Sequence, residues 1–82
     1  MNMQSVFTID LGGLPEAVPA RIGSIEAAGP DHVRLEVMGL CPGRIVEVVQ
    51  AGDPMIVRVL GTRIGLAASL ARSVRVDVVC GG

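Results

Sequence analysis

The sequence predicts a mostly β domain, a small antiparallel barrel with one short helical insert. The chain has 82 residues, the length of one small domain (1–82), and half of these residues are hydrophobic. Short runs in which valine alternates with polar residues are separated by glycine and proline, which is typical of strands joined by tight turns. A closed or half-closed barrel would hide most of the edges that such valine-rich strands otherwise expose.

The N-terminal part of the chain is expected to supply the first one or two strands. Residues 5–15, SVFTIDLGGLP, are apolar but interrupted by glycine and proline, so they fit either a short strand or a lead-in loop. A further strand is expected to begin after Pro19 and to run through Ile25. Gly23 within it would mark a bulge or a bend, because an isolated glycine weakens a regular strand.

Residues 30–39, PDHVRLEVMG, fit two different structures. Polar and apolar residues alternate after Asp31, which is the period of a strand. The pair Pro30 and Asp31 instead indicates a helix start with Asp31 as the N-cap, and Gly39 stands where a glycine commonly follows a helix. The alternation favours a strand, and the residues alone leave both structures open.

An antiparallel meander is the clearest pattern in the chain. Its three strands are expected at 44–50, 55–60 and 63–67. In the first turn, AGDP, Gly52 can take a positive φ and Pro54 needs no hydrogen-bond donor, while Gly61 and Thr62 make the second reversal. Alternation places three residues of the middle strand on one face, namely Met55, Val57 and Val59.

The C-terminal part is expected to close the barrel. Residues 69–73, SLARS, predict a turn or a single-turn helix with Ser69 as its cap. Residues 74–79, VRVDVV, predict a closing strand, and residues 80–82 a frayed tail. Three valines of the closing strand should point inward: Val74, Val76 and Val78.

Composition excludes several classes of function. The net charge is −1 and the seven positive side chains are scattered arginines, so no basic field is available for nucleic acid. No apolar run reaches the ~18 residues of a membrane span, so no membrane insertion is expected. Two cysteines and no secretory signal indicate a soluble cytoplasmic protein with reduced thiols.

Cys41 raises the question of a metal site or a catalytic site. His32 is the only imidazole in the chain and there is no CxxC pair, whereas a metal site needs several ligands at close spacing. His32, Cys41 and an acid would make a mononuclear site, and Cys41 with His32 would make a catalytic dyad that nothing orients. A small apolar residue packed at a turn explains Cys41 as well, so we expect no enzyme activity.

Three motifs in order resemble the FeoA family, the small SH3-like barrel proteins of bacterial ferrous-iron uptake. The first is MGLCPG at 38–43, similar to the family's M/L-G-L-x-P-G. The second is GDP at 52–54, followed by an alternating strand, and the third is GTRIGL at 61–66, similar to G-x-R-L-A-L. The resemblance covers about residues 20–79.

The resemblance implies a fold and a function. The fold would be an SH3-like barrel of five or six antiparallel strands with one short helix, at about 31–38, and Cys41 would be an ordinary occupant of its position. A FeoA-like protein is an accessory partner that binds and modulates FeoB, the membrane ferrous-iron transporter, through its cytosolic GTPase domain. The implied contact residues are Met38, Leu40, Pro42, Gly43, Arg58 and Arg63.

Two rival hypotheses remain. Similar SH3-like domains form the C-terminal part of DtxR-type repressors, which suggests a small metal-binding or metal-sensing domain. Such a domain would bind Fe(II) or another transition metal weakly through His32, Cys41 or Asp53. The other rival is a weak homo-oligomer that pairs strand edges.

Overall fold

The structure, a computed structural model, describes residues 5–80. The six strands are β1 (Ser5–Asp10), β2 (Ala20–Ile25), β3 (Ile45–Gln50), β4 (Met55–Val59), β5 (Thr62–Leu66) and β6 (Val74–Cys80). The helical elements are the 3₁₀ turn η1 (Leu11–Gly13) and the helices α1 (Pro30–Val37) and α2 (Ala68–Ala71). The chain is therefore mostly β, and its six strands confirm the five or six expected.

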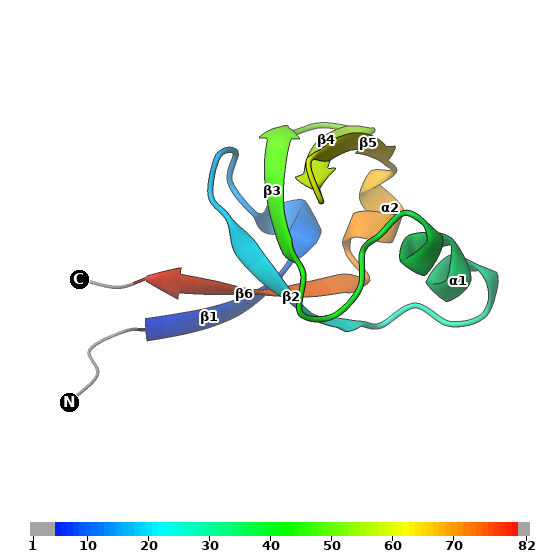
Figure 1. Cartoon of the computed structure of the whole chain (residues 1–82), viewed down its shortest axis with the longest axis horizontal. Coiled ribbons are helices and arrows are strands. Elements are labelled where there is room, and N and C mark those ends of the chain that lie inside the picture. The colour runs from blue at the N-terminus through cyan, green and yellow to red at the C-terminus, as the bar shows by residue number, and fades with distance from the viewer. Residues whose placement is uncertain (1–4, 81–82) are drawn as a thin grey trace.

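All six strands form one antiparallel sheet in the order β1-β6-β2-β3-β4-β5. The sheet curls around its own interior, and α1 and α2 lie at one end of it (Figure 1). Within residues 5–80, the edge strands β1 and β5 do not pair with each other, so the barrel is half-open. No helix in this part of the chain has the length and apolar character that crossing a bilayer requires.

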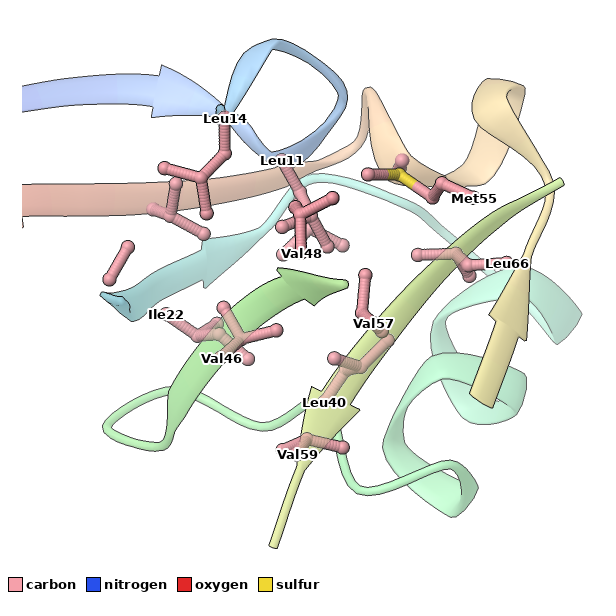
Figure 2. Close-up of a cluster of buried hydrophobic side chains, with 14 of the residues drawn as sticks. Leu11, Leu14, Ile22, Leu40, Val46, Val48, Met55, Val57, Val59 and Leu66 are labelled. Carbon is pink, nitrogen blue, oxygen red and sulfur yellow. The ribbon is translucent and has the colours of Figure 1, made fainter. Parts of the chain in front are cut away.

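The interior is aliphatic and is built by strand alternation. Val48 on β3 stands opposite Val57 on β4, which in turn stands opposite Ile64 on β5, so these residues share the inner face. Figure 2 shows the buried side chains pointing from several strands toward one interior. The buried residues are Leu11, Leu14, Ala20, Ile22, Leu35, Leu40, Val46, Val48, Met55, Val57, Val59, Leu66, Ala71, Val74 and Val76.

The strand predictions are largely confirmed. The N-terminal segment is a strand followed by η1, and β2 carries the expected irregularity, a register shift between Ile22 and Ser24 that brackets Gly23. The meander strands agree with their predicted ranges to within one residue at each end. The predicted inner faces of β4 and β6 are also correct, since Met55, Val57, Val59, Val74 and Val76 are buried and Val78 packs partly buried against them.

The ambiguous segment is a helix, which confirms the helix at about 31–38 that the family resemblance implied, and the strand that its alternation favoured is wrong. Leu35 is its one fully buried residue, while Val33 and Val37 on either side of it are exposed. In a strand these three residues would share a face, whereas a helix turns Leu35 alone toward the interior. Gly39 has a φ of 95° just after the helix, as its predicted C′ position requires.

The predicted helix caps are both wrong. Gly29, not Asp31, occupies the N-cap of α1; Pro30 begins the helix and Asp31 lies in its first turn. In α2 the N-cap is Ala67, and the backbone N–H of Ala68 is bound by Asp53 Oδ1 at 3.1 Å. A carboxylate from the β3–β4 connection therefore supplies the contact expected from Ser69. At the chain's end, Cys80 closes β6, and the rest of the predicted tail lies outside the described residues.

Two strands project from the barrel as an arm. β1 and β6 pair along their whole length, from Ser5 opposite Cys80 to Asp10 opposite Arg75. The pairing of β2 with β6 ends at Asp77. Beyond that point β1 and β6 continue as a two-stranded ribbon at the end of the molecule away from α1 (Figure 1).

Candidate functional site

The motif at 38–43 forms a corner between α1 and β3. Its chain reverses at Gly39 and is tied back to the helix by a hydrogen bond from the N–H of Leu40 to the carbonyl of Leu35 at 3.0 Å. At the other end, the N–H of Gly43 donates to the carbonyl of Ile22 at 2.7 Å. These two anchors hold the corner on α1 and β2, so its surface is presented by a fixed backbone.

The tip of the β4–β5 hairpin lies against this corner. Leu60 and Gly61 form the two-residue turn, and both have positive φ, 53° and 73°. A Cβ placed on Gly39 would stand 3.7 Å from Leu60 Cδ1 and 3.8 Å from Val59 Cγ1, so the hairpin tip and the corner are in close contact. A Cβ at these distances would make ordinary van der Waals contacts, so glycine is favoured at position 39 by its positive φ of 95°.

Leu60 is an unusual residue for such a turn. Asparagine, aspartate and glycine are preferred there, because a left-handed backbone conformation costs a residue with a Cβ roughly 1–2 kcal/mol. The side chain is also 66% exposed, so little burial offsets this cost. Backbone strain at an exposed apolar residue is more typical of a binding position than of a structural one.

An apolar patch surrounds this contact. We define the corner patch as Val37, Met38 and Leu60. Val37 is 82% exposed and Leu60 66% exposed, while Met38 is half-buried and packs against the interior. Val37 and Met38 directly precede Gly39, and Leu60 lies against Gly39. Single exposed apolar residues are ordinary, but several at one rigid corner are typical of a surface that contacts another protein.

Of the two arginines on the β4–β5 hairpin, only one is paired with a carboxylate among the described residues. Glu47, Arg58 and Arg63 stand opposite one another across β3, β4 and β5. Arg58 Nη1 contacts Glu47 Oε1 at 2.8 Å, whereas no ion pair in the described part of the chain includes Arg63. Like charges directly opposite each other are unfavourable, so Arg63 is a positive group for which a carboxylate from outside would be a favourable partner.

The structure brings most of the predicted contact residues to one end of the molecule. Met38, Pro42 and Gly43 lie on the corner, and Arg58 and Arg63 lie on the hairpin that touches it. The predicted contact residue Leu40 does not lie on this surface. It is fully buried, because the reversal at Gly39 turns its side chain into the interior. Leu40 therefore supports the corner from within and offers no contact surface.

Sequence reasoning missed two members of the patch. Val37 was not among the predicted contact residues, and its exposure follows from the helical conformation of α1. Leu60 was assigned to the end of a strand. The signal that could have found it is the placement of a leucine directly before the Gly61 reversal, where a two-residue hairpin loop asks for a residue that tolerates positive φ.

The candidate metal ligands are spread over the structure. His32 Nε2 lies 3.5 Å from Glu36 Oε2 one turn along α1, and Cys41 Sγ lies 3.8 Å from the carbonyl oxygen of Glu36. Asp53 is engaged elsewhere, at the start of α2. Among residues 5–80, no three His, Cys, Asp or Glu side chains form a group that could hold a metal ion. Metal binding by His32, Cys41 or Asp53 stays a prediction.

Comparison with known proteins supplies the context for this geometry. The FeoA domain model matches residues 9–78. No curated protein matches the chain by sequence. Among solved structures, iron(II) transport protein A from Clostridium thermocellum is 34% identical with a TM-score of 0.82; the match covers 85% of this chain and 45% of that protein, so this chain spans less than half of that protein's length.

Two other structures extend the comparison. Stenotrophomonas maltophilia FeoA complexed with zinc, described as a prokaryotic SH3 domain protein, is 30% identical with a TM-score of 0.76 over 84% of this chain and 89% of that one. T. acidophilum IdeR is 27% identical with a TM-score of 0.81 over 94% of this chain and 37% of that one. With an SH3-like barrel and a family match over 9–78, the chain belongs to the FeoA family, which is associated with ferrous iron transport.

Proposed function

We propose that this chain is a cytoplasmic accessory protein of ferrous iron uptake that binds and modulates the FeoB transporter through its cytosolic GTPase domain. The role is one of contact and regulation, with no catalysis by this chain. The observation that supports it most is the corner patch, where Val37 and Leu60 are exposed. Arg63 follows Leu60 on the same hairpin and has no ion-pair partner among the described residues.

The chemistry of the corner patch suits a protein partner. Interface centres combine apolar side chains with arginine, whose planar guanidinium binds carboxylates with two hydrogen bonds. The matching surface should therefore present an apolar residue to Leu60 and a carboxylate to Arg63. Pro42 and Gly43, exposed beside the patch, would form part of the rim.

The size of the molecule limits the strength of this contact. The chain exposes 4897 Å². A standard interface of about 800 Å² per partner would take roughly a sixth of that surface, more than the three residues of the corner patch can supply. We expect a polar rim and an affinity in the micromolar range, which suits a regulatory contact that forms and dissociates repeatedly.

An NMR titration of the isotope-labelled chain with the cytosolic domain of the cognate FeoB, with and without a GTP analogue, tests the proposal. We expect shift changes clustered at 38–43 and 58–63, and a loss of these changes on Leu60→Ala. Phe7→Ala, on the distant arm, is the matched control and should leave them intact. Unchanged spectra at high micromolar partner concentration would contradict direct binding to this domain.

A second candidate function is weak binding of Fe(II) or another transition metal. The zinc complex of the S. maltophilia protein favours it, as does the pairing of His32 with Glu36 on one helix face near Cys41. A third ligand would have to move into place, because a stable site needs about four. Anaerobic Fe(II) titration tests this: stoichiometric binding lost in His32→Ala or Cys41→Ser supports it, and binding indifferent to both variants contradicts these ligands.

A further inference from the structure

Among residues 5–80, no strand pairs with the outer edge of β1, and the sequence carries no charged side chain between Ser5 and Ile9. In this part of the chain β1 is the terminal strand of the sheet and pairs only with β6. Proteins usually protect such edges with charges, prolines or short strands, because a row of free backbone groups invites another strand. The opposite edge strand, β5, has Arg63 at its second position. β1 is six residues long, and its one charged residue, Asp10, stands at its end, so Ser5–Ile9 have no such charge.

Hydrogen bonding in the sheet determines which backbone groups of β1 are free. The N–H of Ile22 donates to the carbonyl of Arg44 at 2.8 Å, and its carbonyl accepts from Gly43 at 2.7 Å, so the backbone of Ile22 faces the β3 side. Val76 stands opposite Ile22 on β6. In antiparallel sheets opposite residues bond either to each other or away from each other, so the backbone of Val76 faces β1.

The same alternation continues into β1. Ile9 stands opposite Val76, and Phe7 stands opposite Val78, so the backbones of Ile9 and Phe7 point inward to β6. The N–H and C=O groups of Val6 and Thr8 therefore point outward at the free edge. Within the described chain, no hydrogen bond to the backbone of Thr8 comes from outside the β1–β6 pair.

Phe7 is the residue that this edge leaves uncovered. Ile9 and Val78, on the same face of the arm, are partly buried and pack against the interior. Phe7 lies one step further out and is 54% exposed, although it is the only aromatic residue of the chain. A two-stranded ribbon is marginally stable in water, and an exposed aromatic ring on it would gain from a partner surface.

We propose that this chain forms a homodimer in which β1 pairs antiparallel with β1 of a second copy, centred on Phe7. In this register the outward groups of Val6 bond to those of Thr8 in the second copy, and the reverse, so all free groups of both residues are satisfied. Phe7 then stands opposite Phe7 of the second copy in a close, non-hydrogen-bonded pair, where side chains approach best.

The absence of charge at this edge favours a second copy as the occupant. Two copies of one strand related by a two-fold axis run antiparallel and present the same backbone groups to each other, so identical apolar edges can pair. Complementary charge is one means of selecting a foreign strand, and between Ser5 and Ile9 there is no charged residue to supply it. The corner patch lies at the other end of the molecule, so dimerisation and partner binding can occur together (Figure 1).

Analytical ultracentrifugation of the full chain, from low micromolar to millimolar concentration, tests the dimer with a matched pair of variants. Thr8→Pro removes the outward N–H at an edge position where the monomer tolerates proline. Thr8→Val also loses the hydroxyl that donates to Asp77 Oδ1 at 2.9 Å, but it keeps the N–H. We expect a dimer that Thr8→Pro weakens at least about tenfold and Thr8→Val about twofold or less.

Two results would overturn the proposal. A wild-type chain that stays monomeric at millimolar concentration would exclude the homodimer and leave a foreign strand as the occupant of this edge. A Thr8→Pro variant that dimerises as strongly as the wild type would exclude pairing through β1.

A cross-linking measurement decides the register and does not depend on proline. In a Cys41→Ser, Cys80→Ser background, Phe7→Cys should oxidise to a covalent dimer, because a close antiparallel pair meets the Cα separation that a disulfide requires. Leu60→Cys, at the distant hairpin tip, is the control. Cross-linking at least about tenfold faster for Phe7→Cys supports the register centred on Phe7, and equal rates contradict it.

Discussion

The two ends of this molecule both expose apolar residues, but they differ in the charged residues nearby. At the corner end, Val37 and Leu60 are exposed and Arg63 follows Leu60 on the same hairpin, while the backbone at 40–43 is held by hydrogen bonds to α1 and β2. On the arm, Phe7 is exposed on a ribbon of two strands with no charged residue between Ser5 and Ile9. A charged, rigid apolar patch suits a partner of complementary composition, whereas an uncharged open edge suits a copy of itself.

The support beneath the two ends differs as well. The corner rests directly on the core, because Leu40 and Leu35 are fully buried beneath it. On the outer arm, β1 and β6 have only each other as neighbouring strands among the described residues, since the pairing of β2 with β6 ends at Asp77. The corner should therefore keep its shape without a partner, while the outer arm gains order when it is covered.

The largest expected effect tests this difference in support. Leu40→Ala should lower the free energy of unfolding by about 2–5 kcal/mol, because it leaves a cavity under the corner. Phe7→Ala should lower it by less than about 1 kcal/mol in the monomer, because its ring is already half in water. Urea denaturation at low micromolar concentration measures both. Equal losses in the two variants would mean that the arm is as integral to the fold as the corner.

The next effect concerns charge. Arg63→Glu should weaken binding of the corner to its acidic partner surface by about tenfold, since an attraction becomes a repulsion. Added salt should weaken the wild-type complex in the same direction but leave the β1 dimer unaffected. Titrations at low and high ionic strength measure this. Arg72→Glu, an exposed site on another element, is the control, and an equal loss in that variant would indicate a general charge effect.

The smallest effect concerns the strained turn. Leu60→Asn should raise the free energy of unfolding by about 1 kcal/mol, because asparagine tolerates the positive φ that leucine occupies at a cost. The same variant should weaken partner binding by removing the apolar tip. Denaturation and NMR titration of one sample measure both effects. Greater stability with unchanged binding would remove Leu60 from the contact surface.

Much of the candidate site was visible in the sequence. The motif at 38–43 was expected to lead from a helix into a strand, and the motif at 61–66 to form a reversal and a strand. Both expectations are confirmed, because turn chemistry and strand alternation are local properties. That the two motifs form one contact surface was implied only by the family resemblance and stays a prediction. Leu40 was predicted to be a contact residue and Leu60 the end of a strand, although Leu40 is fully buried and Leu60 is 66% exposed. Both are leucines next to glycines, so only the path of the chain separates their roles.

The helix caps also show that local patterns do not determine tertiary contacts. Asp31 and Ser69 have the side chains that cap helices, yet neither caps the helix predicted for it. In α2 the first N–H is instead bound by Asp53, fifteen residues before it in the chain. A contact of that kind depends on where the β3–β4 connection lies in space, which no local pattern encodes.

By itself the sequence determined the meander, the inner faces of its strands and the glycine-directed reversals, because period-two alternation and backbone conformation act over a few residues. Tertiary structure decided the features for which these short-range effects favour no single outcome, namely helix against strand and exposure against burial. It made 30–37 a helix, because only Leu35 had an interior to enter. It left Val37, Leu60 and Phe7 in water, because exposure is set by which strands and helices meet and where their pairing ends.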